Sequence, residues 1–201
     1  GSDPNARVHV YKGPFVIDRT TTVKARAIGP LDDASFPVEA VLTKRPHDWT
    51  VKVLSGYSTQ YTGGGENAII DGIRGTTNFA SGEWQGYQPK DLIATIDLQR
   101  ETEIKRVGGG FLQNARSWIW MPTRIEFEVS SDGIDFTKVA DIKTDVAPDD
   151  MKEQIKDYMT EIAPTKARYV RVHAYNLGKI PAWHPGAGDD AFIFVDEIII
   201  Q

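Results

Sequence analysis

Cysteine is absent from the 201-residue chain, and its absence excludes several kinds of chemistry. Without thiols the protein can form no disulfide, hold no metal through thiolates and use no cysteine nucleophile. Long apolar runs are absent too, since none approaches the roughly 20 residues that a membrane helix requires. A signal peptide is also missing from the sequence. We therefore expect no insertion into a membrane.

Charges of one sign do not accumulate anywhere in the sequence. The formal net charge is -5 at pH 7, and lysine and arginine are interspersed with aspartate and glutamate. A nucleic-acid-binding protein needs a basic face for the phosphates, and a membrane-surface anchor commonly needs a polybasic cluster. The charge pattern therefore argues against nucleic acid and against a membrane surface as partners.

Sequence signatures of catalysis are missing as well. The chain has no Gly-x-Ser-x-Gly motif, and its four histidines show no zinc-site spacing. The neighbouring acids Asp196 and Glu197 lie in an expected strand, where adjacent side chains point to opposite faces, so we do not expect them to act on one substrate. We expect no enzyme activity in this chain.

Period-two alternation predicts β-strands through most of the chain. Apolar residues at 125, 127 and 129 alternate with charged ones, and residues 169–174 show the same pattern. Turn signals such as Ser131-Asp132-Gly133 separate these runs. Many short strands with regular turns are typical of an all-β sandwich or barrel.

One stretch permits two interpretations. Met151, Ile155, Tyr158, Met159 and Ile162 fall at helical spacing, so periodicity alone predicts a helix over residues 150–161. The alternative is a strand through residues 158–162 that leads into the next strand at Tyr169.

Two regions differ in texture. Residues 1–45 carry short β-like runs with turn signals, and a piece of this size buries little surface by itself. Residues 46–201 repeat the β pattern on a larger scale. We expect Lys44-Arg45-Pro46-His47 to link the two regions.

The segment Ala68-Ile69-Ile70-Asp71-Gly72-Ile73-Arg74-Gly75-Thr76 could wrap a hard cation. A carboxylate, a glycine turn and a hydroxyl five residues later are followed by carbonyl oxygens that could complete a calcium shell. A second carboxylate is needed, and Glu197 is the candidate. The alternative is an ordinary Asp-Gly turn together with an acid in the last strand.

Aromatic residues are the main candidates for ligand contact. Trp84, Trp118 and Trp183 lie in turn-like stretches, where exposed rings could stack on the C–H face of a sugar. Gln113 and Arg116 follow a strand and offer donors for hydroxyl groups. The alternative is that the tryptophans fill the core, and in Trp118-Ile119-Trp120 at most one of the two is expected to face solvent.

The second region, residues 46–201, resembles the discoidin domain, also called the coagulation-factor V/VIII type C domain. Its motifs occur in the family order: Ala68-x-x-Asp71-Gly72, Thr76, Ser130-Ser131-Asp132-Gly133-x-x-Phe136, Ala167-Arg168-Tyr169-Val170-Arg171-Val172 and Val195-Asp196-Glu197-Ile198. The resemblance implies a galactose-binding-like jelly-roll β-sandwich of eight strands, and therefore a strand in the ambiguous stretch. It also implies a bacterial carbohydrate-binding module.

The resemblance further implies a structural calcium ion. Its ligands would be the side chains of Asp71, Thr76 and Glu197 and the backbone carbonyls near Ala68 and Arg74. Ligand residues vary within the family. For a galactose-type or N-acetylhexosamine-type glycan we expect seven of them: Trp84, Tyr87, Gln113, Arg116, Trp118, Trp183 and His184.

The first region, residues 1–45, is similar to part of the small β-sandwich beside the catalytic domains of chitobiases and β-hexosaminidases. The matching residues are Tyr11-x-Gly13-Pro14-Phe15-x-Ile17 and Thr20-Thr21-Thr22-Val23-Lys24-Ala25-Arg26-Ala27, while the opening strand is missing. The resemblance implies a fragment of an exported bacterial β-N-acetylhexosaminidase, secreted, periplasmic or cell-surface, with its catalytic domain upstream. The alternative function is a structural spacer that packs against that domain and binds no sugar.

Overall fold

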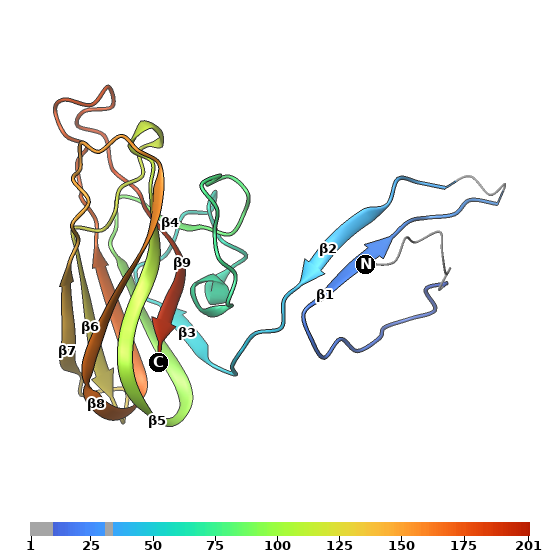
Figure 1. Ribbon diagram of the computed structural model, residues 1–201, viewed down its shortest axis with the longest axis horizontal. Helices are drawn as coiled ribbons and strands as arrows, with labels where there is room; N and C mark the ends of the chain where they lie inside the picture. Colours follow the sequence, from blue (N-terminus) through green and yellow to red (C-terminus); the bar gives the residue numbers. More distant parts are fainter. Residues whose placement is uncertain (1–9, 31–33) are drawn as a thin grey trace. The chain divides into compact units, whose positions relative to one another are not determined.

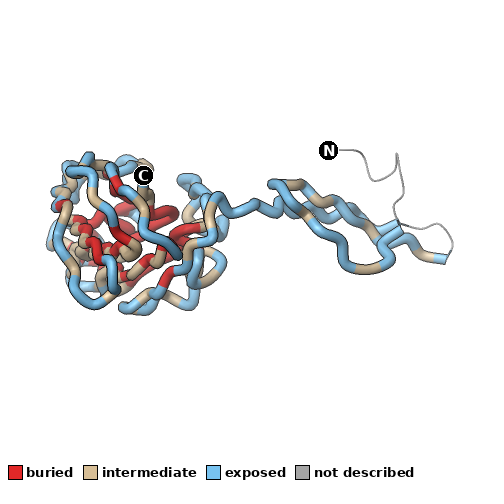
Figure 2. The backbone as a smooth tube through the Cα atoms, turned by 90° about the horizontal axis from the view of Figure 1, so that it is seen from below, coloured by how far each residue is buried: buried red, intermediate tan, exposed pale blue. Residues whose placement is uncertain are grey.

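The computed structural model describes residues 10–30 and 34–201 and divides the chain into two units, Gly1–Pro46 and His47–Gln201. In the first unit, β1 (Thr21–Ala25) and β2 (Val38–Leu42) form an antiparallel pair (Figure 1). Lys24 lies opposite Glu39 and forms a 2.7 Å salt bridge with it. None of the described residues of this unit is buried (Figure 2). A two-stranded pair of this kind is marginally stable by itself.

The second unit is an antiparallel β-sandwich. Its elements are β3 (Thr50–Val53), the 3-10 helix η1 (Glu66–Ile70), β4 (Gln85–Tyr87), β5 (Leu92–Gln113), the 3-10 helix η2 (Ala115–Ser117), β6 (Arg124–Ser130), β7 (Thr137–Lys143), β8 (Gln154–Tyr175) and β9 (Ile193–Ile200). The strand order is β4-β9-β5-β8-β6-β7, and β3 pairs with the first half of β5. This confirms the predicted all-β jelly-roll sandwich.

The two longest strands, β5 and β8, join the layers of the sandwich. They pair over most of their 22 residues, and the register shifts between Asp97 and Thr102 as the strands curve (Figure 1). The first half of β5 lies between β3 and β8, whereas its second half lies between β9 and β8. Inward-facing apolar residues from both layers then form the main core, which includes Ile96, Phe127 and Val172.

The helix suggested by periodicity at residues 150–161 is wrong, and the strand implied by the family resemblance is correct. β8 begins at Gln154 and pairs with β5 from Gln113 onward. Met151 lies before the strand and packs in a separate cluster, so the apparent helical spacing joins residues of two different environments. The ladder to β5 decides the conformation, because strand formation depends on cross-strand neighbours more than on local pattern.

No helix within residues 10–30 and 34–201 has the length and apolarity needed to cross a bilayer.

Candidate functional site

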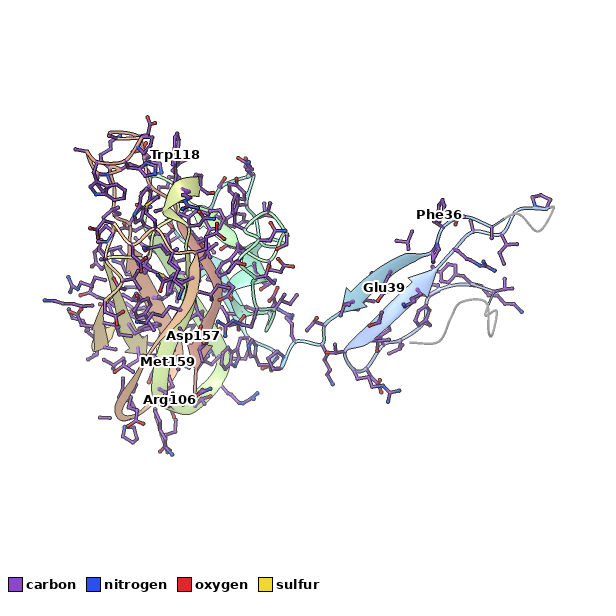
Figure 3. The ribbon with its side chains drawn as sticks, turned by 45° about the horizontal axis from the view of Figure 1, so that its top comes forward. Phe36, Glu39, Arg106, Trp118, Asp157 and Met159 are labelled. Carbon is purple, nitrogen blue, oxygen red and sulfur yellow. The ribbon has the colours of Figure 1, made fainter. Side chains whose placement is uncertain are left out.

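Trp118 lies at the tip of a closed loop between β5 and β6 (Figure 3). Asn114 caps η2 by accepting a hydrogen bond from the Ser117 amide, and two backbone hydrogen bonds of 3.0 and 3.1 Å join Asn114 to Ile119. Trp118 has a left-handed backbone with φ of 65°, which breaks the strand alternation. Its side chain is therefore 37% exposed, whereas Trp120 is 1% exposed, as expected for a pair of which at most one faces solvent.

A second loop, residues 181–190, packs beside Trp118. A Cβ atom added to Gly186 would lie 2.8 Å from the Trp118 indole, so a glycine is needed for this close contact. His184 is nearly buried, accepts the Gly186 N–H at 3.0 Å through Nδ1, and contacts the edge of the Trp120 ring. Trp183 is 49% exposed beside it. The structure thus places two exposed indoles on adjoining loops.

Three of the predicted ligand residues are buried, which corrects the expectation that they face a sugar. Trp84 is 1% exposed and donates through Nε1 to the Thr76 carbonyl at 2.8 Å. Tyr87 is fully buried, its hydroxyl donates to Gln85, and burial raises its pKa. Gln113 is also buried, and its amide donates to two carbonyls in the segment before β8. These side chains hold the loops in place.

The other four predicted ligand residues lie together around the two loops. Arg116, on η2, is exposed next to the exposed Trp118 and Trp183, while His184 fixes the shape of the second loop. Their contact with a ligand stays a prediction.

Sequence reasoning missed an aromatic pocket formed by two other loops. The cavity measures about 270 Å³, similar in scale to a small ligand. Residues of the β3–η1 and η1–β4 segments line it: Gln60, Tyr61, Thr62, Gly63, Phe79, Ala80, Gly82 and Trp84. No charged side chain is among these lining residues. The signal that could have found it is Tyr61 within the turn-rich stretch 58–65, which resembles the tryptophan loops in composition.

Phe192 connects the aromatic pocket to the Trp118 loop. Its ring lies 5.6 Å from the Tyr61 ring, in an edge-on arrangement, and its backbone N–H donates to the Trp118 carbonyl at 2.8 Å. Tyr61 also lies 6.2 Å from Phe79 and 4.8 Å from Phe194, so the pocket wall is a packed aromatic cluster. Such a wall is rigid, because every ring is held by its neighbours.

The loop of residues 71–76, here called the 71–76 loop, follows η1 and lies against β9. The Gly72 N–H donates to Glu197 Oε2 at 3.0 Å, and Asp71 Oδ1 accepts the Ile73 N–H at 2.8 Å. Burial raises the pKa of Glu197 to about 7, and the charges of Asp71 and Asp196 raise it further. A carboxylate that is costly to ionise beside other carboxylates is an environment that a bound cation would relieve.

The oxygen donors of the 71–76 loop fit a hard cation. Asp71, Thr76 and Glu197 offer side-chain oxygens, and Ala68 and Arg74 offer backbone carbonyls, all of which calcium prefers over nitrogen or sulfur. No group of three or more histidine or acidic side chains able to hold a metal occurs among the described residues. A calcium site here would therefore depend on two carboxylates supported by hydroxyl and carbonyl oxygens.

Asp196 also contacts the 71–76 loop, which corrects the expectation that Asp196 and Glu197 act on separate faces. Asp196 Oδ2 accepts the Gly75 N–H at 2.9 Å and the Arg74 Nε–H at 2.9 Å. The β5–β9 register shifts between Gly110 and Phe111, opposite these acids. This irregularity disturbs the alternation, so both carboxylates reach the same loop.

The fold and these loops define an antiparallel jelly-roll module with exposed aromatic side chains on its loops. The chain belongs to the F5/8 type C domain family, which matches residues 54–196 and corresponds to the predicted discoidin domain. Residues 1–38 match the Fn3 associated family, and the chitobiase-type assignment of this region stays a prediction. No curated protein matches the sequence.

Solved structures share the fold of the second unit. A fragment assigned as a chitobiase, from Bacteroides thetaiotaomicron, superposes with a TM-score of 0.54 at 17% identity, covering 76% of this chain and 87% of that one. CpGH89CBM32-5 from Clostridium perfringens, solved in complex with GalNAc-beta-1,3-galactose, gives 0.50 at 19% identity, covering 76% and 94%. At these identities the likeness shows the fold.

Proposed function

We propose that the second unit is a non-catalytic carbohydrate-binding module whose aromatic pocket receives one neutral sugar ring. The observation that carries the proposal is the uncharged, aromatic-walled cavity of about 270 Å³ connected through Phe192 to the exposed Trp118. A pyranose presents a C–H face that packs on aromatic rings and a rim of hydroxyls that need hydrogen-bond partners. Phe79 and Tyr61 supply the apolar wall, while the Gln60 amide and the Thr62 hydroxyl supply partners.

Trp118 would contact a second sugar beside the pocket. Its indole is exposed, its backbone is fixed by the closed loop, and Gly186 supports its ring from below. Trp183 and Arg116 are exposed near it and would contact a longer chain. A rigid platform of this kind loses little conformational entropy on binding.

Galactose and N-acetylhexosamines are the first sugars to test, since CpGH89CBM32-5 has the same fold and was solved with a disaccharide of this type. A shallow site with one or two stacked rings supplies about 4 kcal/mol, corresponding to a dissociation constant of about 1 mM. We infer that such a module keeps a secreted glycoside hydrolase, of the β-N-acetylhexosaminidase type, close to its substrate. Tethering raises the effective concentration without new chemistry.

We also propose that a calcium ion binds the 71–76 loop through Asp71, Thr76 and Glu197 and the carbonyls of Ala68 and Arg74. The support is the set of oxygen donors and the raised pKa of the buried Glu197 carboxyl group. Calcium would neutralise that carboxylate and stabilise the fold. It would take no part in sugar chemistry.

The competing function is a structural spacer that binds no sugar. On that alternative the loop tryptophans would be covered by another domain, because tryptophan is enriched in protein interfaces. The exposure of Trp118 and Trp183 fits either a sugar or such a partner, but the uncharged pocket fits a sugar better.

Titration with galactose, N-acetylgalactosamine and N-acetylglucosamine tests the proposal by tryptophan fluorescence. We expect a saturable change with one of them in the wild-type chain, about tenfold weaker binding in Gln60→Ala, and weaker binding of a disaccharide in Trp118→Ala. Phe136→Ala is the matched control, because Phe136 follows the opposite end of β6 and lies against Arg171. Equal affinity in Gln60→Ala and the wild type would contradict the pocket, and no response to any sugar would favour the spacer.

A further inference from the structure

Arg74 extends from the 71–76 loop and contacts a carboxylate on each of two strands. Its Nε donates to Asp196 on β9 at 2.9 Å, and its Nη1 donates to Asp157 on β8 at 3.2 Å. Nη2 forms a further ion pair with Asp157. Since β8 and β9 pair with opposite edges of β5 at Gly110, the guanidinium crosses over that strand.

Gly110 makes this crossing possible. A Cβ atom at this position would overlap Asp196 Oδ1 and Arg74 Nη2, and would come within 2.9 Å of Asp157 Oδ1. Only glycine leaves room for the guanidinium to lie flat on the strand. Figure 3 shows Asp157 on the face of the sandwich where this contact is made. The backbone and the three charged groups therefore form one packed unit.

Asp196 requires a cation where it lies. Its side chain is fully buried, and its Oδ1 accepts no hydrogen bond from the described residues. A buried carboxylate without a partner is strongly destabilising, so a paired positive charge is needed. Arg74 supplies that charge at 2.9 Å, and hydrogen bonds to Asp157 and then Asp196 raise the pKa of Arg74, so that it stays charged.

The same contacts fix the backbone of the 71–76 loop at several points. Asp196 holds the Gly75 N–H, Glu197 holds the Gly72 N–H, and the Thr76 carbonyl accepts the Trp84 indole N–H. The Trp84 ring also lies directly against Gly75. The loop is thus tied to β9 through its backbone and to β8 through the Arg74 side chain.

We propose that Arg74 is a built-in cation that orders the 71–76 loop without any metal ion. Arg74 is a positioning residue: it joins the loop to Asp157 and Asp196, and the loop amides then reach Asp196 and Glu197. The consequence for calcium rests on the calcium site proposed above. Calcium would bind a loop that is already in place, so it would add stability without causing a disorder-to-order transition.

Amide hydrogen exchange of Gly72 and Gly75 in the full chain, with EDTA present, tests the proposal. We expect both amides to be protected in the wild type without metal. In Asp157→Asn we expect exchange of both to accelerate about tenfold or more, which is the scale of one charge-assisted hydrogen bond. Asp157 is the better first target, because its side chain is 42% exposed and its replacement leaves Arg74 paired with the buried Asp196.

Asp145→Asn is the matched control. Asp145 forms an ion pair with Lys156, the neighbour of Asp157 on β8, and its side chain is 68% exposed. This variant removes one carboxylate from the same region without touching the loop, so the exchange of Gly72 and Gly75 should not change.

Calcium addition separates the two proposals. Unprotected amides in wild-type protein with EDTA, followed by protection with calcium, would show that the metal orders the loop and would overturn the role of Arg74. Equal exchange in Asp157→Asn and the wild type would overturn it as well. If calcium alters neither exchange nor melting temperature in any variant while Asp157→Asn still loosens the loop, the calcium site fails and the role of Arg74 stands.

Discussion

Individual side chains of the same type have different roles in this molecule, and sequence alone does not separate them. Trp84 and Trp183 both lie in turn-like stretches, yet one is 1% exposed and the other 49%. Trp84 is buried because Gly75 leaves room for its ring and the Thr76 carbonyl accepts its indole N–H. These contacts join segments that a linear pattern does not connect, so burial could not be predicted from composition.

Stability measurements should separate the two tryptophans. We expect Trp84→Ala to lower the free energy of unfolding by about 3 to 5 kcal/mol, because it removes a fully packed ring and leaves a cavity. Trp183→Ala should change it by less than about 0.5 kcal/mol, as surface substitutions do. Urea denaturation measures both values, and equal losses in the two variants would contradict the assigned positions.

The Asp97–Arg168 pair predicts a pH effect on stability. Two hydrogen bonds of 2.8 Å from Arg168 lower the pKa of Asp97 below its usual value, and the Gln99 amide contributes. Because the folded-state pKa is depressed, the stabilisation is present above the unfolded-state pKa and is lost as the pH falls through the folded-state value. Thermal melts from about pH 5 to about pH 1 should therefore show a smaller loss in Asp97→Asn than in the wild type. Parallel pH profiles would contradict this.

At the scale of elements, alternation predicted the strands well where one face is buried. Residues 124–129 and 169–174 lie in β6 and β8 as expected. The pattern failed at residues 150–161, where pairing with β5 overrides a helical spacing, and at Trp118, where a left-handed residue breaks the alternation. Register shifts and left-handed residues depend on tertiary contacts, which explains why the pocket and the Asp196 contact were missed.

The glycines of β5 give a prediction at this scale. A Cβ at Gly108 would overlap the backbone carbonyl of Tyr158 and the sulfur of Met159 on the paired strand, whereas a Cβ at Gly109 would lie 3.1 Å from the flexible end of Ile198. We expect Gly108→Ala to destabilise the fold by roughly 1 to 3 kcal/mol, as overpacking does, and Gly109→Ala to cost less. Chemical denaturation of both variants provides the comparison, and the reverse order would refute the close approach of β5 and β8.

At the scale of the whole molecule, the main core is drawn entirely from residues 51–198. A chain of residues 47–201 should therefore fold by itself, with a melting temperature within a few degrees of that of the full chain. Calorimetry of the shortened and full chains tests this. Loss of a cooperative transition in the shortened chain would show that the sandwich depends on residues 1–46.

The most direct test of the central claim is an NMR titration that follows the five tryptophan indole N–H signals as galactose or an N-acetylhexosamine is added. The account predicts saturable shifts for Trp84, which lines the pocket, and, with a disaccharide, for the exposed Trp118. The Trp120 signal, whose N–H donates to the Pro148 carbonyl at 2.9 Å in the interior, should stay in place. Saturable binding that leaves Trp84 and Trp118 unmoved, or no shift with any sugar at tens of millimolar, well above the expected affinity of about 1 mM, would contradict a sugar site in these loops.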